Sequence, residues 1–180
     1  MAPNLHLAHI SDLLLVWTVF LYAFAMFGYA AEFAATRRVA RGGPADVVDN
    51  GRRRAAKFGR MAVALTFAGW ATHFATVTTR GVAVHRVPWG NMYEFSCMVT
   101  LVAVTIYLLL ILQGPIRKIA ATVLLRPNRH ALTWQARESV RYLGAFVMAP
   151  VVLYLGLAGT VLYASPGPLV PALNSYWIKI

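Results

Sequence analysis

The sequence is poor in charged residues, and acidic ones are the scarcest. Asp, Glu, Lys and Arg make up 13% of the 180 residues, whereas soluble domains carry about 25%. Six residues are acidic, which leaves little for general acid–base catalysis. With 59% hydrophobic residues and a mean hydropathy of +0.59, this composition predicts an integral membrane protein.

Cysteine and the common catalytic motifs are scarce too. Cys97 is the single cysteine, so the chain can form neither an intrachain disulfide nor a CxxC pair. The sequence contains no GxSxG, HExxH, Walker or GxGxxG motif. These absences argue against the hydrolases, zinc proteases and nucleotide-binding enzymes that depend on such motifs.

Long apolar runs are what the sequence has instead. Four of them approach or exceed the roughly 20 residues that a helix needs to cross the hydrocarbon core of a membrane. They lie at residues 13–36, 61–79, 95–116 and 142–164. The last run should stop before the "SPGP" segment, because two prolines and a glycine break a helix. Backbone groups in lipid must be hydrogen-bonded internally, so we expect an all-α integral membrane protein with four transmembrane helices.

The basic residues predict the orientation of these helices. Eight Lys and Arg residues lie in the link 37–60 and six in the link 114–141, against three elsewhere. The positive-inside rule places both links in the cytoplasm, and the segments 80–94 and 165–180 outside with both termini. The whole chain, residues 1–180, is then a single transmembrane domain in the cell membrane.

The net charge of +11 follows from the same distribution. Basic links of this kind set topology and contact anionic membrane lipid. Because no compact basic domain is present, the sequence argues against nucleic-acid binding.

The two basic links carry different expectations. The first, 37–60, contains "RGGPADVVDNG" and is expected to be mobile. In the second, 114–141, "IRKIAATVLL" has apolar residues at helical spacing. This stretch either lies along the membrane surface or extends the third span, and the sequence leaves both open.

Two histidines are candidate ligands. His73 lies midway along the second span, where ionisable groups are costly and often functional. Its neutral imidazole could ligate haem iron, or it could hydrogen-bond a neighbouring helix. His85 lies in the short outer segment, where it could contact an anionic group or a metal centre, or be an ordinary surface residue.

The segment "RVPWGNMYEFSCM", residues 86–98, predicts the outer start of the third helix. Asn91 is a good N-cap and Glu94 follows three residues later, which is the spacing of a capping box. Trp89 and Tyr93 suit the lipid headgroup layer. The local chemistry therefore predicts a capped helix start at the outer membrane face.

The same segment resembles a known family. Pro88, Asn91, Tyr93 and Glu94 match the P-x-x-N-x-Y-E segment of cytochrome c assembly proteins of the CcsA/ResC type, called CcsB in actinobacteria. These are the haem-handling membrane subunits of the system II cytochrome c maturation pathway.

A second stretch, "LVPALNSYWIKI" at 169–180, is similar to the family's outer PAL-x-S-x-W-x-x-H segment, with Trp177 at the tryptophan. In the family a haem-liganding histidine follows, and a tryptophan-rich haem-binding loop and two further histidines come later. None of these is among the 180 residues, so we expect the chain to be the amino-terminal portion of such a protein.

The resemblance implies a function that a complete protein would share with a ResB-type membrane partner. Together they would deliver haem to the outer face for covalent attachment to apocytochrome c, and the complex acts as a cytochrome c synthetase, or haem lyase. Because this chain lacks the family's ligand segments, its own enzymatic status stays open, and we expect weak or no haem binding. The residues implied to lie near haem are Pro88, Trp89, Asn91, Tyr93, Glu94 and Trp177.

Two functions unrelated to haem remain as alternatives. The chain could be a four-span membrane transporter that uses Glu94 or His73 along a path. It could also anchor a partner, for example as a structural subunit of a respiratory complex.

Overall fold

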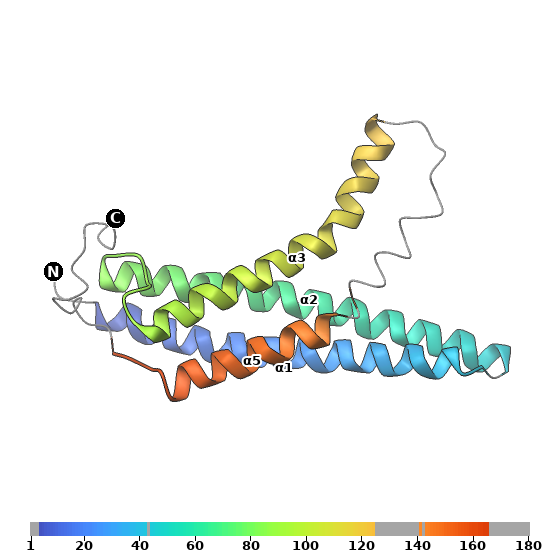
Figure 1. The fold of residues 1–180 in the computed structure, drawn as a ribbon, viewed down its shortest axis with the longest axis horizontal. Coiled ribbons are helices and arrows are strands. Elements are labelled where there is room, and N and C mark those ends of the chain that lie inside the picture. The colour runs from blue at the N-terminus through green and yellow to red at the C-terminus, as the bar shows by residue number, and fades with distance from the viewer. Residues whose placement is uncertain (1–3, 43, 125–140, 142, 166–180) are drawn as a thin grey trace.

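The computed structural model describes residues 4–42, 44–124, 141 and 143–165, without the side chains of 114–124. Within these residues the protein is all-helical and contains no strand. The helices are α1 (Leu5–Ala40), α2 (Ala45–Val84), α3 (Met92–Leu124) and α5 (Gly144–Thr160). They run lengthwise in alternating directions, and the α1–α2 turn lies at the opposite end from the α2–α3 loop (Figure 1).

Helices α1 and α2 form one long antiparallel hairpin. The residues 37–60, expected to be a mobile link, are instead the end of α1, a short turn and the start of α2. That expectation is wrong because the Arg, Lys and Ala residues around the turn are good helix formers, and Gly42, at φ +82°, allows a tight turn. At 36 and 40 residues, the helices are about 54 and 60 Å long, roughly twice the hydrocarbon thickness.

The hairpin is held by a heptad-like seam. Buried residues of both helices recur at alternating spacings of three and four, the 3.5-residue period of a left-handed coiled coil. In α1 they are Ala8, Ser11, Leu15, Thr18, Tyr22, Ala25, Tyr29 and Glu32. In α2 the same repeat runs through Ala55, Gly59, Ala62, Thr66, Gly69, His73, Thr76, Arg80 and Ala83. The seam consists largely of small and polar residues rather than leucines, which is typical of helix pairs that approach closely in membranes.

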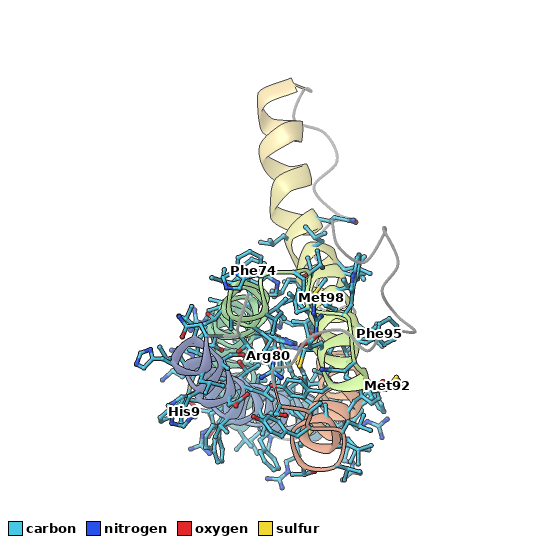
Figure 2. The ribbon with its side chains drawn as sticks, turned by 90° about the vertical axis from the view of Figure 1, so that its left-hand side faces the viewer. His9, Phe74, Arg80, Met92, Phe95 and Met98 are labelled. Carbon is cyan, nitrogen blue, oxygen red and sulfur yellow. The ribbon has the colours of Figure 1, made fainter. Side chains whose placement is uncertain are left out.

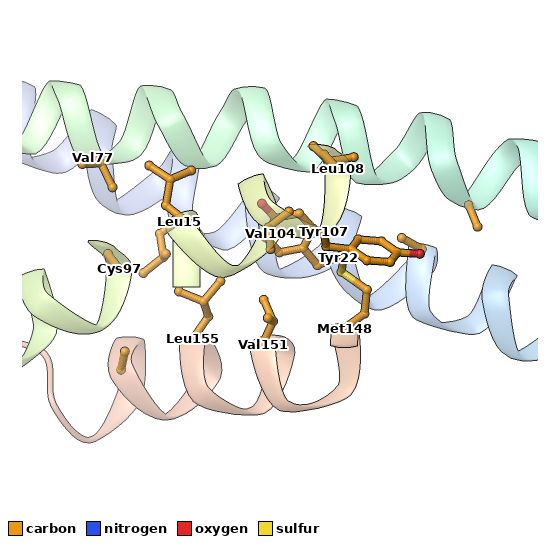
Figure 3. Close-up of a cluster of buried hydrophobic side chains, with 14 of the residues drawn as sticks. Leu15, Tyr22, Val77, Cys97, Val104, Tyr107, Leu108, Met148, Val151 and Leu155 are labelled. Atoms are coloured by element: carbon orange, nitrogen blue, oxygen red, sulfur yellow. The ribbon is translucent and has the colours of Figure 1, made fainter. Parts of the chain in front are cut away.

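Helices α3 and α5 complete the bundle. Helix α5 lies against α1 and α3, and α3 also contacts α2. Tyr22 of α1, Val104 and Tyr107 of α3, and Met148 and Leu155 of α5 meet in the apolar core (Figure 3). Hydrophobic packing therefore joins α5 to the bundle, whereas polar and small residues join α1 to α2.

The fourth predicted span and the second link can now be compared with the structure. Helix α5 ends at Thr160, before the "SPGP" segment, as predicted. Helix α3 continues to Leu124 without interruption, whereas its candidate membrane span ends at Gln113, so whether the rest lies along the membrane surface or extends the span stays a prediction. Its C-terminal part, which contains Pro115, turns away from the other helices (Figure 1).

Two helices of the described part are long and apolar enough to cross a membrane. They are α1 and the Met92–Gln113 part of α3. Helix α5 is strongly apolar but has 17 residues, and α2 does not reach this apolarity. An all-helical protein with two candidate membrane spans is thus established, and both support a membrane location.

Close approach of α1 and α2 generates a first prediction. A Cβ at Gly69 would lie 2.6 Å from the buried ring of Tyr22, while a Cβ at Gly156 of α5 meets nothing within 4 Å. We expect Gly69→Ala to lower the free energy of unfolding by about 1–3 kcal/mol, because the helices must move apart. Gly156→Ala should leave it unchanged or slightly raised. Unfolding in mixed micelles, followed by circular dichroism, measures both, and equal effects would contradict the packing described.

Candidate functional site

A cluster of buried and partly buried charges joins the four helices at the end where α2 stops and α3 begins. Its members are Asp12, Arg80, Arg86 and Glu94, and we call it the outer charge cluster. Arg80 and Glu94 are 2% and 1% exposed. Arg80 lies among the helices, whereas Phe74, Phe95 and Met92 lie on the outside of the bundle (Figure 2). Such burial is tolerated when each charge is paired and hydrogen-bonded, so the partners of these groups define the site.

Glu94, in the first turn of α3, gathers most of the donors. Its Oε2 accepts a hydrogen bond from Arg86 Nη1 at 2.7 Å and one from the Gly90 N–H at 3.0 Å. Its Oε1 lies 3.5 Å from Arg80 Nε. One carboxylate therefore holds the end of α2, the loop after it and the start of α3 together.

Arg80 extends the cluster to the other two helices. Its Nη1 lies 3.5 Å from Asp12 Oδ1 of α1, and its Nη2 donates to the carbonyl of Ala164, beyond the end of α5. The guanidinium also lies 5.0 Å from the ring centroid of Tyr93, within cation–π range. Arg80 of α2 thus contacts α1, α3 and the residues that follow α5.

Asp12 completes the charge balance. Its Oδ2 accepts a hydrogen bond from Tyr163 OH at 2.7 Å, and Tyr93 OH lies 3.4 Å from its Oδ1. Two arginines then face two carboxylates, so the cluster is neutral overall. Neutrality of this kind limits the desolvation cost of burying Arg80 and Glu94.

The loop between α2 and α3 is short and well fixed. His85 ends α2 in the left-handed conformation, at φ 54°, and the Arg86 N–H bonds back to the carbonyl of Gly81 at 3.2 Å. Pro88 is buried over Gly81. The loop therefore follows a defined path back to α3, although it has no regular secondary structure.

The predicted capping of α3 is confirmed in its main contact. The Glu94 N–H donates to Asn91 Oδ1 at 2.8 Å, as an N-cap requires. The return contact differs from a capping box, because Glu94 accepts from Gly90 rather than from Asn91. Arg86 and Arg80 draw the carboxylate toward the bundle and away from the Asn91 N–H.

The aromatic residues of the loop separate into two environments. Trp89 is 46% exposed, in keeping with an expected place at a membrane surface. Tyr93, expected in the headgroup layer with it, is buried between Arg80 and Asp12, and that expectation is wrong. Trp177 lies outside the described residues.

The two candidate histidine ligands lie apart. His73 is fully buried, and its Nδ1 lies 3.3 Å from Tyr22 OH, which is the interhelical hydrogen bond that the sequence left open. Its Nε2 makes no hydrogen bond of normal geometry with any described residue. His85 is exposed on the loop, beside Arg86 but outside the outer charge cluster.

The described residues were searched for groups of side chains that could ligate a metal. In the described part of the chain no three His, Cys, Asp or Glu side chains gather as a metal site. His73 is enclosed by the bundle, so it does not face an outer ligand. Trp89 and His85 are both exposed in the segment that joins α2 to α3.

A second buried ion pair lies toward the α1–α2 turn. Glu32 of α1 accepts a hydrogen bond from Arg141 Nε at 2.9 Å. Gly59 of α2 makes room for this carboxylate, since a Cβ there would overlap it. Arg37, which is near in sequence, lies instead over the ring of Phe33 at 4.7 Å. Both ends of the bundle are therefore fastened by a buried carboxylate and arginine.

Sequence reasoning missed three of the four charges in the outer cluster. Arg80 and Arg86 were counted only among the basic residues that predict the orientation of the helices, and no role was predicted for Asp12. The spacing held a usable signal, because Arg80 continues the repeat through His73 and Thr76. An ionisable residue on an interior stripe must find a partner inside the bundle.

Comparison of the chain with protein-family models, curated proteins and solved structures found no match. The resemblance to cytochrome c assembly proteins therefore stays a prediction, carried by the motif residues alone.

The outer charge cluster generates a second prediction. Glu94→Ala leaves Arg80 and Arg86 buried without their main counterion, and we expect a loss of about 3–5 kcal/mol in the free energy of unfolding. The control is Asp49→Ala, which removes the acidic partner of Arg53. The side chains of Arg53 and Asp49 are 74% and 60% exposed, so this variant should lower the free energy of unfolding by about 0.5 kcal/mol or less. Thermal unfolding of both purified variants in detergent checks this. Similar losses in the two would show that Glu94 does not hold the cluster.

Proposed function

We propose that the chain is a four-span protein of the cell membrane that serves c-type cytochrome biogenesis, as the amino-terminal part of a CcsA/ResC-type protein. Its outer end would help present haem for attachment to apocytochrome c, together with a ResB-type partner. One observation carries this proposal: the outer charge cluster fixes the P-x-x-N-x-Y-E segment in place and leaves Trp89 exposed beside it.

The exposed side chains support four spans. Large apolar residues face outward on every helix, while the buried side chains include Ser, Thr, Tyr, His, Glu and Arg, the reverse of the usual pattern in a soluble protein. Examples are Phe20, Phe24 and Phe27 of α1, Phe67 and Phe74 of α2, Ile106 and Leu109 of α3, and Phe146 and Leu153 of α5.

Helix α2 is the least apolar span, and its burial pattern accounts for this. Its polar residues Thr66, His73, Thr76 and Arg80 are all buried against neighbouring helices. A hydropathy average counts these residues as if lipid met them. The surface that lipid would meet contains Phe67 and Phe74 instead, so α2 can span a membrane as part of the bundle.

The matched motif residues have structural roles at the outer end. Asn91 caps α3, Glu94 binds Arg86 and the Gly90 amide, and Tyr93 lies against Arg80. In the proposal these are positioning residues. Contact with the porphyrin edge falls to Trp89, with His85 beside it on the same loop.

Haem ligation by the described residues is not part of the proposal. The family's histidine ligands and tryptophan-rich loop would come from segments that follow this portion. The role of the described residues is then to hold a rigid surface beside them, because catalysis of this kind depends on positioning the reactants.

Trp89 provides the third prediction. In the product of the whole gene, expressed with its ResB-type partner, we expect Trp89→Ala to lower co-purified haem severalfold. The matched control is Trp17→Ala, since Trp17 is similarly exposed but faces outward on α1. Absorption spectra of the purified complex measure haem, and the yield of holocytochrome c measures function.

Haem content and cytochrome yield that are unchanged by Trp89→Ala would overturn the haem-handling role. That result would favour the alternative function, a transporter or a partner anchor. This alternative draws on a different observation, the row of polar residues inside the bundle that includes Thr66, His73 and Thr76.

The crossing of the membrane by α2 gives the fourth prediction. In a Cys97→Ala background, a cysteine at Trp89 should react with a membrane-impermeant maleimide in intact cells. A cysteine at Asp46, exposed at the other end of α2, should react only after permeabilisation. The unchanged wild-type protein, whose one cysteine, Cys97, is buried, serves as the unreactive control. Labelling of both sites from outside would place the whole hairpin on one side of the membrane and contradict four spans.

A further inference from the structure

A groove opens between α1 and α2 near their connecting turn. It has a volume of about 540 Å³, within the range of roughly 300–1,000 Å³ that is usual for small-molecule sites. Most of its lining is apolar, contributed by both helices. The apolar residues include Ala31, Ala34, Val39, Val47 and Phe58.

Two arginines line the same groove. Arg38 of α1 and Arg54 of α2 are both exposed, and neither forms an ion pair with a described residue. Their neighbour Arg53 differs, because it is paired with Asp49 at 3.0 Å. The groove therefore has an apolar floor and two guanidinium groups without acidic partners in the described structure.

The register of the hairpin brings these two arginines to one level. Close approaches place Gly28 opposite Ala62, Glu32 opposite Gly59, and Val39 opposite Gly51. By this register, Arg38 and Arg54 lie about two residues apart along the helix axes, or about 3 Å. Two guanidinium groups at one level suit a single phosphodiester, which arginine binds in bidentate fashion.

The level of the groove relative to the membrane indicates its ligand. Ala31 and Ala34 belong to the last turns of the first apolar run, and Arg38 follows the end of that run directly. In the four-span arrangement proposed above, on which this step rests, the apolar floor starts in the hydrocarbon and the arginines lie among the phosphates. Basic pockets between helices at the cytoplasmic face are typical sites for acidic lipids.

We propose that this groove binds an anionic phospholipid. Arg38 and Arg54 hold its phosphate, and an acyl chain lies on the apolar floor between Ala31 and Phe58. A soluble anion could bind the two arginines but would make no apolar contact with the floor of the groove. An acidic protein segment would not require the site to continue into the hydrocarbon.

The test compares matched charge variants of the purified full chain. Arg38→Gln with Arg54→Gln removes both groove arginines. Arg52→Gln with Arg53→Gln removes the same charge from exposed neighbours that do not line the groove. Binding of phosphatidylglycerol, with phosphatidylcholine as the neutral probe, is measured by native mass spectrometry in detergent. We expect the groove variant to bind phosphatidylglycerol roughly tenfold more weakly, and the neighbouring variant to bind almost as wild type.

Three outcomes would overturn the proposal. An equal loss in both variants would show general surface attraction rather than a site. Equal binding of phosphatidylcholine by the wild type would show that the arginines do not select the headgroup. Full competition by millimolar inorganic phosphate would show a site for a soluble anion.

A second variant pair tests the groove without changing charge. Ala34→Trp fills the apolar floor, whereas Ala30→Trp adds the same bulk at an exposed position outside it. Loss of phosphatidylglycerol binding in Ala34→Trp alone supports the proposal, and unchanged binding overturns it. This assay contains no haem, so its result is independent of the proposed role in cytochrome assembly.

Discussion

The contact between Arg80 and Glu94 is the constraint on which the outer half of the molecule depends. Both side chains are buried, and an unpaired charge at either position would cost several kcal/mol. Their remaining partners come from α1, from the loop after α2 and from the residues beyond α5. The helix ends must therefore meet in one arrangement, and that arrangement fixes the position of the loop that contains Trp89.

The polar seam between α1 and α2 works by the same logic along the length of the bundle. Small residues bring the helices close, and pairs such as Thr18 with Thr72 and Tyr29 with Thr66 satisfy each other at 3.0 Å. A hydrophobic surface outside and a polar seam inside is a stable combination in lipid, where apolar contact alone does not hold helices together. Glu32 and Arg141 then fasten the bundle toward the α1–α2 turn, as Arg80 and Glu94 fasten its opposite end.

The sequence allowed the all-helical class, the Asn91 cap and the end of α5 to be predicted, because each depends on local chemistry. It did not reveal that residues 37–40 and 45–60 are helical, since glycine, proline and charge there are also typical of loops. Glu32 has Arg37 and Arg38 nearby in the sequence, yet its partner in the structure is Arg141, which is 109 residues away. Arg80 and Asp12 were missed for the same reason: pairing between helices depends on register, which no single segment contains.

The length of the α1–α2 hairpin has a mechanical consequence. Helix α2 runs without a break from its start at Ala45 to Arg80, and α1 accompanies it from Ala40 to Asp12. In the four-span arrangement proposed above, about 30 Å of α2 lies inside the hydrocarbon, and roughly 24 Å of the Ala45–Arg80 stretch stands outside as a stiff arm. In that arrangement, a force applied near Gly42 on one side of the membrane would be transmitted along two continuous helices to the loop after α2 on the other side.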